Sequence, residues 1–226
     1  MPLAIIVPVL NEAGGIDAAL QALQPLRRRG AMIVVADGGS VDGTTERACA
    51  LADLLVSSAR GRACQMNAGA RAVADADPLL FLHADTRLPE DADRLIADAI
   101  ASGARWGHFD ARIDGAGPLG LVALAMNLRS RLSSICTGDQ AIFCCRDLFD
   151  TLGGYADLPI MEDIDFSLRA RGIMRAVALR PPVITSGRRW QKRGVLRTIV
   201  QMWSLRWRYY RGADPAALAR EYRDIR

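Results

Sequence analysis

The chain has 226 residues, half of them hydrophobic, which suits one domain with a substantial core and excludes a disordered protein. Its formal net charge is +4, yet residues 186–211 carry eight basic residues and no acidic one, so the remainder is net acidic. The basic character belongs to one C-terminal segment, and we therefore expect no nucleic-acid partner.

The cysteines and histidines indicate neither disulfides nor a zinc site. The five cysteines contain no CxxC pair, and the two histidines lack zinc-finger spacing. We expect reduced thiols in a soluble, cytoplasmic protein. The chain opens directly into an apolar strand, which predicts no signal peptide, and its apolar runs are too short to cross a bilayer.

The first hundred residues alternate between buried apolar runs and helical repeats. Strands are expected at residues 3–9, 32–36, 54–57 and 79–82, and helices from residue 16 and at 44–52, 62–74 and 91–102. Such alternation predicts a parallel sheet with helices on both faces. Ligands of such sheets bind beyond the carboxyl ends of the strands.

The second half is less regular. Strands are expected at residues 106–113, 140–145, 177–179 and 183–185, the last two flanking Pro181-Pro182. Helices are expected at 119–132, 162–170, 195–211 and 215–222. The fold class is therefore α/β, with a Rossmann-like, mostly parallel sheet and a C-terminal helical segment.

Polar clusters directly follow three of the expected strands. Asp37 at a strand end could accept hydrogen bonds from a nucleobase, and Gly38 lets the backbone turn there, although a plain capped turn would look the same. Asp85 suits a divalent cation that bridges two phosphates, and His83 could assist with Mn²⁺. The alternative is that Asp85 merely caps a turn.

Three more clusters carry charge. Residues 162–165 (Glu-Asp-Ile-Asp) begin a helix, where the helix dipole favours acidic side chains. Three acids in four residues are more than capping requires, and one could be a general base. Arg60-Gly61-Arg62, which lead into Gln65, Asn67 and Gly69 at a helix start, indicate an anion site. Arg188-Arg189 beside Trp190 could hold a diphosphate or could be a solvated basic turn.

Together the clusters resemble the family 2 glycosyltransferases, whose fold is called GT-A. The resembling segments lie between about residues 3 and 190, and they are Val7–Glu12, Asp37–Thr44, Gly61-Arg62 with Asn67 and Gly69, His83–Thr86, Gly154-Tyr155 and Glu162-Asp163. Within the family, the chain is most similar to a small bacterial branch described as radical-SAM/selenodomain-associated transferases.

The resemblance implies residue roles. The nucleotide-sugar site would comprise Pro8, Asn11, Glu12, Asp37, Gly38, Ser40, Arg62, Ala84, Asp85, Arg188 and Arg189. Asp85 would bind Mn²⁺ or Mg²⁺ as the second Asp of the family's Asp-x-Asp signature, whose first Asp is replaced here by His83, a second candidate ligand. Asp163 would be the catalytic base. The acceptor side would comprise Gly138, Asp139, Gln140 and Glu162.

The expected organisation is a GT-A domain at 1–190, with a nucleotide-sugar half at 1–100 and an acceptor half at 101–190, followed by a helical extension at 191–226. The expected function is metal-dependent, inverting transfer of a sugar from a nucleotide-diphosphate sugar to an unknown acceptor hydroxyl. Ser186 replaces the Gln of the Gln-x-x-Arg-Trp motif of processive synthases, so we expect single transfers.

Two other functions compete with sugar transfer. A nucleotidyltransferase can use a similar sheet, but no basic residue follows the first strand until Arg27. A non-catalytic module that binds through the basic tail would not explain the acidic clusters at the strand ends.

The C-terminal helix carries an apolar stripe at helical spacing. Its members are Leu196, Ile199, Val200, Trp203, Trp207 and Tyr210, flanked by Arg197, Arg206, Arg208 and Arg211. The stripe could pack on the core or on a second subunit of a homodimer. It could instead lie in an anionic membrane surface, which would make the protein peripheral at the inner membrane face and fit a lipid-linked acceptor.

Overall fold

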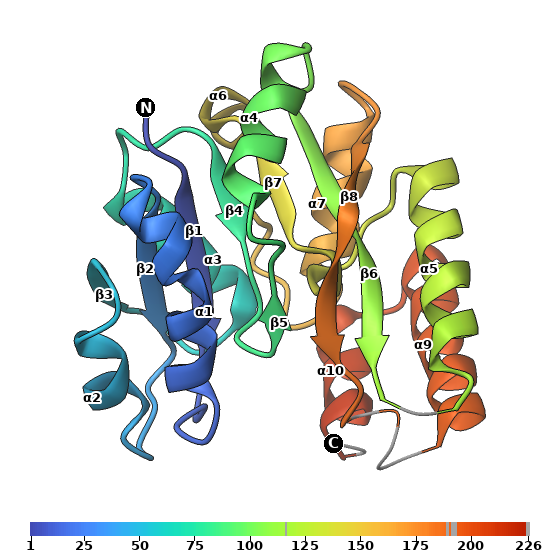
Figure 1. Ribbon diagram of the computed structural model, residues 1–226. Coiled ribbons are helices and arrows are strands. Elements are labelled where there is room, and N and C mark those ends of the chain that lie inside the picture. Colours follow the sequence, from blue (N-terminus) through green and yellow to red (C-terminus); the bar gives the residue numbers. More distant parts are fainter. Residues whose placement is uncertain (116, 189, 191–193, 225–226) are drawn as a thin grey trace.

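A computed structural model describes residues 1–115, 117–188, 190 and 194–224 of the chain. Within this part, one sheet of eight strands has the order β3-β2-β1-β4-β7-β6-β8-β5 (Figure 1). The strands are β1 (Ala4–Val9), β2 (Met32–Asp37), β3 (Leu54–Ser57), β4 (Leu79–Phe81), β5 (Thr86–Arg87), β6 (Trp106–Asp114), β7 (Ile142–Cys144) and β8 (Val177–Ser186).

The helices follow the expected order closely. They are α1 (Ile16–Arg28), α2 (Thr44–Cys49), α3 (Arg62–Ala72), α4 (Ala92–Ala101), α5 (Leu119–Ser133), the short 3₁₀ turn η1 (Gly138–Gln140), α6 (Arg146–Thr151), α7 (Glu162–Arg171), α9 (Val195–Tyr210) and α10 (Pro215–Asp224). Three short elements, β5, η1 and α6, were not expected, because each is too brief to show a hydrophobic period.

The sheet changes character halfway across. Strands β3, β2, β1 and β4 pair in parallel, as the βα alternation predicts. Beyond β4, β7 runs antiparallel to both of its neighbours, β8 is parallel to β6, and β5 is antiparallel to β8. The α/β fold class is confirmed, with the parallel half formed by the first hundred residues.

Residues 177–186 form one strand, so the expectation of two short strands around Pro181-Pro182 is wrong. The pairing of β8 with β6 shifts register between Phe109, which faces Leu179, and Ala111, which faces Val183. The prolines therefore lie in a bulge, where their missing N–H groups cost the ladder nothing. The strand continues past them.

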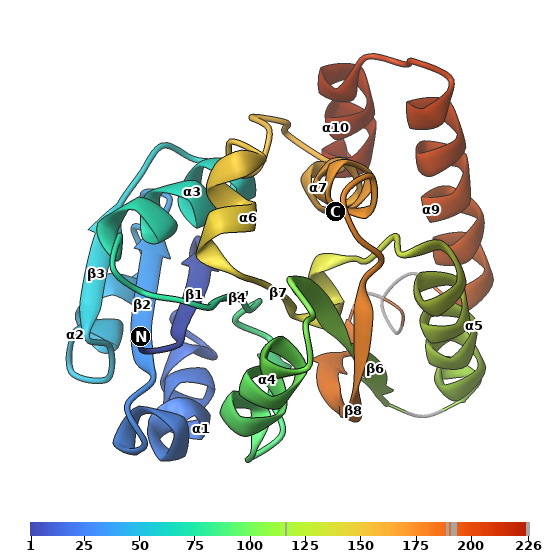
Figure 2. The same ribbon diagram turned by 90° about the horizontal axis from the view of Figure 1, so that it is seen from above.

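Helices cover both faces of the sheet (Figure 2). Ile5 and Val7 of β1 pack with α1 and α4 on one face, and Ala4 and Ile6 pack with α3, α6 and α7 on the other. This alternation follows from the period of two along a strand that is buried on both sides. The expectation of helices on both faces is confirmed.

The C-terminal helices add a third, smaller cluster. Leu205 of α9 and Leu218 of α10 are fully buried against Ile160, Met161 and Ile164, around the start of α7. The extension therefore packs on the domain. Within the described residues, no helix is long and apolar enough to span a bilayer.

Candidate active site

The loops after β1 and β2 interlock. Ser40 Oγ accepts the backbone N–H of Asn11 at 2.8 Å, and Asn11 Oδ1 accepts that of Val41 at 3.0 Å. Thr44 Oγ1 accepts the N–H of Glu12 at 2.8 Å. Two of the polar clusters seen in the sequence thus form one connected structure, because adjacent parallel strands end at the same edge.

Asp37 is only 6% exposed, and its carboxylate serves this loop. It accepts the backbone N–H groups of Gly39 at 2.9 Å and Ser40 at 3.0 Å. A carboxylate with two such donors is held in place before any ligand arrives. Pro8, another residue of the expected nucleotide site, is buried within β1 and pairs with Ala36.

Gln65 of α3 ties the two strand ends together, a role that was not identified from the sequence. Its Nε2 donates to the carbonyl oxygens of Val9 at 2.5 Å and Ala36 at 3.0 Å. Gly38 permits this approach, because a Cβ there would lie 3.0 Å from the Gln65 amide carbon. No motif marks Gln65; only the packing of α3 on the sheet reveals its role.

A cavity of about 520 Å³ opens between the loop after β1 and the end of β8, and we call it the open groove. Its charged lining residues include Glu12, Asp85, Asp114 and Arg188, and Ala84 also lines it. Asp85 and Arg188 are both exposed. Thr86 pairs with Thr185 across β5 and β8, and this pairing brings these two distant segments together.

A second cavity, of about 70 Å³, lies at the start of α7, and we call it the α7 pocket. Asp163 is fixed on its wall: Oδ2 accepts the N–H of Gly138 at 2.9 Å, and Oδ1 accepts that of Ile164 at 2.8 Å. The first turn of a helix favours an ionised carboxylate. Asp163 is therefore a positioned acceptor with lone pairs left over.

An ion pair lines the same pocket. Arg62 Nε of α3 lies 3.0 Å from Oε1 of Glu162, whose side chain is only 3% exposed. Burial raises the pKa of Glu162, and the charge of Arg62 acts against that rise. Glu162 in turn raises the pKa of Arg62. The pair joins α3 to α7, two helices that lie far apart in the sequence.

His83 faces the α7 pocket. Its Nδ1 lies 3.3 Å from Asp139 Oδ1 and its Nε2 lies 3.4 Å from Arg62. A Cβ on Gly138 would come within 2.3 Å of the His83 ring, so the close approach needs glycine. Asp85, two residues later, lines the open groove instead, so the two candidate metal ligands face different cavities.

The donor set at Asp85 fits a cation that a diphosphate would help to coordinate. No group of three or more His, Cys, Asp or Glu side chains that could hold a metal occurs among the described residues. Mg²⁺ and Mn²⁺ sites in phosphate-binding enzymes use one or two protein carboxylates, with phosphate oxygens and water as the remaining ligands. The exposed carboxylate of Asp85, in the open groove that Arg188 also lines, can serve as such a single protein ligand.

The remaining expected site residues do not share one location. Gln140 is fully buried and donates to Ser130 Oγ at 2.8 Å, so it supports the loop that carries Gly138 and Asp139. Arg189 lies outside the described residues. Met202 and Arg206 of α9, with Tyr222 of α10, line the α7 pocket, and the sequence analysis had assigned no site role to their segment.

Comparison with known proteins shows the family of the chain. Residues 4–148 match the family described as Glycosyl transferase family 2. The succinoglycan biosynthesis protein ExoA of Rhizobium meliloti is 39% identical over 112 residues, which are 44% of this chain and 33% of ExoA. The chain thus matches about a third of that relative's length.

Three solved structures share the fold. Residues 1–349 of S. aureus TarS have a TM-score of 0.64 at 18% identity, over 84% of this chain and 61% of that one. The mannosyltransferase PcManGT of Pyrobaculum calidifontis, with GDP-Man and Mn²⁺, has a TM-score of 0.61 at 24% identity, over 90% and 60%.

Glucosyl-3-phosphoglycerate synthase of Mycobacterium tuberculosis, with Mn²⁺, UDP and glucosyl-3-phosphoglycerate, has a TM-score of 0.57 at 18% identity, over 82% and 70%. These likenesses confirm the expected GT-A fold.

Proposed function

Because the chain belongs to glycosyl transferase family 2, we propose that it transfers a sugar from a nucleoside-diphosphate sugar to an acceptor hydroxyl. One observation supports this most directly: Asp163 is fixed by two backbone N–H groups on the wall of a pocket. His83 lines that pocket, and the next two residues, Ala84 and Asp85, line a groove large enough for a nucleotide. The likeness to structures solved with GDP-Man or UDP and a divalent cation is consistent with it.

The open groove is the proposed donor site. Its volume of about 520 Å³ lies within the range of small-molecule sites. Asp85 is the carboxylate that would hold Mn²⁺ or Mg²⁺, and the chemistry such a cation supplies is neutralisation of the charge on a diphosphate leaving group. Arg188 at the same groove contributes a second positive charge to the diphosphate.

Asp163 is the proposed general base. It removes the proton of the acceptor hydroxyl while that oxygen forms a bond to the anomeric carbon. The bond between that carbon and the diphosphate oxygen breaks on the opposite side, and the nucleoside diphosphate leaves. One displacement inverts the anomeric carbon. Glu162 and Arg62 position the pocket by their mutual ion pair.

A thermal-shift screen tests the donor class. UDP-, GDP- and dTDP-sugars are added with and without Mn²⁺, since a ligand that binds only the native state raises the melting temperature. We expect one base series to raise it, and more strongly with Mn²⁺. Release of the nucleoside diphosphate from that donor is then measured. A folded protein that responds to none of the three series contradicts the proposal.

A further inference from the structure

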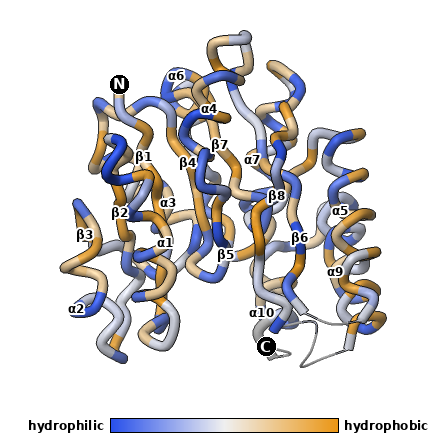
Figure 3. Tube along the Cα trace, viewed as in Figure 1, coloured by the Kyte–Doolittle hydropathy of each residue, from blue (hydrophilic) through white to orange (hydrophobic). Residues whose placement is uncertain are grey.

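Two helices present apolar side chains to solvent. On α9 these are Leu196, Val200, Trp203, Trp207 and Tyr210, exposed by 52% to 76%; on α5 they are Leu121, Leu124, Leu128 and Leu132, exposed by 55% to 70%. We call these nine residues the α5–α9 face. The two helices lie side by side at one edge of the molecule (Figures 1 and 2), and both carry hydrophobic stretches (Figure 3). Of the alternatives for the α9 stripe, packing on the core does not apply to these five side chains.

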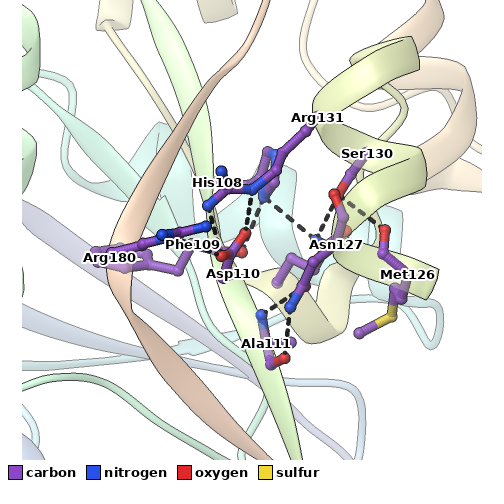
Figure 4. A network of polar contacts seen from close by, with 10 residues as sticks. His108, Phe109, Asp110, Ala111, Met126, Asn127, Ser130, Arg131 and Arg180 are labelled. Atoms are coloured by element: carbon purple, nitrogen blue, oxygen red, sulfur yellow. Dashed lines mark hydrogen bonds and ion pairs between the residues drawn. The ribbon is translucent and has the colours of Figure 1, made fainter. Parts of the chain in front are cut away.

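The opposite sides of both helices are occupied. Asn127 of α5 pairs with both backbone groups of Ala111 at 2.9 Å, and Arg131 binds Asp110 of β6 through two hydrogen bonds (Figure 4). Leu205 on the inner side of α9 is fully buried. The helices are thus attached by one side, and their apolar stripes are turned away. Large apolar side chains gathered on such a surface indicate an interaction site.

The charge around this face selects the partner. Residues 115–138 and 186–211 contain no Asp or Glu. Arg131 and Arg208 already pair with Asp110 and Glu221, but Arg197 of α9 and Arg211, which directly follows α9, are exposed. The guanidinium of Arg211 lies 5.1 Å from the ring centre of Trp207. A second copy of the chain would bring these like charges together, whereas an anionic lipid surface would neutralise them. Tryptophan, tyrosine and arginine are favoured where hydrocarbon meets headgroups.

We propose that the α5–α9 face docks this protein on an anionic lipid bilayer. The apolar stripes enter the headgroup boundary and the arginines contact the lipid phosphates. Met202 and Arg206, on another side of α9, line the α7 pocket. Docking would therefore bring the pocket assigned to the acceptor close to the lipid surface. That last consequence rests on the proposed function, but the docking does not.

Vesicle co-sedimentation tests the docking. The full chain is mixed with vesicles of phosphatidylglycerol and phosphatidylcholine, or of phosphatidylcholine alone. We expect sedimentation with the anionic vesicles at low salt, and less of it at about 0.5 M salt, where charges are screened. The double variant Trp203→Ser, Trp207→Ser should bind about a hundredfold more weakly, because two interfacial side chains are lost. Leu55→Ser, on the far edge strand β3, is the control and should bind normally.

A charge-reversal pair makes the test independent of the tryptophans. Arg197→Glu with Arg211→Glu should abolish the preference for anionic vesicles, whereas Arg94→Glu on α4 should not. Each variant's melting curve reports whether it folds. Light scattering after gel filtration measures the oligomeric state without lipid, and we expect a monomer. Protein that stays in the supernatant at low salt, or a dimer that Trp203→Ser with Trp207→Ser disperses, overturns the proposal. Because neither readout involves sugar transfer, docking can fail while the proposed function stands.

Discussion

The open groove, lined by Asp85, and the α7 pocket, lined by His83, are built differently. The groove is about 520 Å³, and exposed charged groups such as Asp85 and Arg188 line it. The pocket is about 70 Å³, and its charged groups are already engaged with one another, as in the pair Arg62–Glu162. The groove is suited to a charged ligand that supplies the missing partners, whereas the pocket holds its groups in place beforehand.

The largest expected effect of a substitution is at the α7 pocket. Asp163→Asn should reduce sugar transfer by about two orders of magnitude or more, because the amide cannot accept the acceptor's proton. An amide oxygen can still accept the N–H of Gly138, so we expect normal donor binding in the thermal-shift assay. Asp165→Asn, two residues further along α7 and paired with Arg169, is the control and should keep most activity. Near-normal transfer by Asp163→Asn would assign the base to another acid.

A substitution in the open groove should weaken donor binding and not only slow sugar transfer. Asp85→Asn should weaken Mn²⁺-dependent binding of the cognate nucleoside diphosphate by roughly tenfold to a hundredfold, because a neutral amide is a poor ligand for a hard cation. Calorimetry with and without Mn²⁺ measures the effect. Asp91→Asn, at an exposed position before α4, should leave it intact. An unchanged dependence on Mn²⁺ in Asp85→Asn would remove this residue from the proposed metal site.

Gln65, which links the ends of β1 and β2, should contribute to the stability of the fold. Gln65→Leu removes two hydrogen bonds, to the carbonyl oxygens of Val9 and Ala36, which should lower the free energy of unfolding by about 2 kcal/mol. Denaturant titration measures this change, and donor affinity should fall with it. Gln21→Leu, on the exposed side of α1, should change stability by less than about 0.5 kcal/mol. Equal effects of the two substitutions would show that Gln65 does not hold the strand ends together.

The buried residue His108 should give the stability of the fold a small dependence on pH. His108 is buried behind Gln140, its Nε2 has no hydrogen-bond partner among the described atoms, and burial lowers its pKa. The unfolded state therefore binds the proton more readily. The stability that His108 contributes is complete above the unfolded pKa of about 6.5 and is lost as pH falls through that value.

His108→Gln should flatten the dependence of the melting temperature on pH between about pH 7 and 5.5. Glu162, whose pKa is raised in the fold, contributes a slope of opposite sign from its unfolded pKa of about 4.3 upward. Comparing the variant with the parent removes that contribution. Identical slopes would mean that His108 does not titrate against burial.

Local patterns were sufficient where an element is long and its period is clear. The helices α5, α7 and α9 and the strands β1 to β3 lie within a few residues of their expected bounds. The pattern failed at β8, because the effect of Pro181 and Pro182 depends on whether a bulge in the pairing with β6 accommodates them. Pairing is a property of two strands, and one strand's sequence does not contain it.

The same limit applies to the site. The acids and arginines at the strand ends could be named from residue type and position, since parallel strands carry their ligands at one edge. The site roles of Gln65 and Arg206 could not be predicted, because each reaches its place through the packing of a helix against distant segments.

By itself, the sequence determined the order of strands and helices, the parallel first half and the chemical groups available at the strand ends, because these follow from hydrophobic period and local turn chemistry. Only the tertiary structure decided that His83 and Asp85 face different cavities, that Gln140 is buried, and that the α9 stripe faces outward. An amphipathic helix always has an apolar side, but the shape and chemistry of what it packs against select the side that is buried. In α9 the sides that carry Leu205 and Met202 met the rest of the domain, which left the tryptophans exposed.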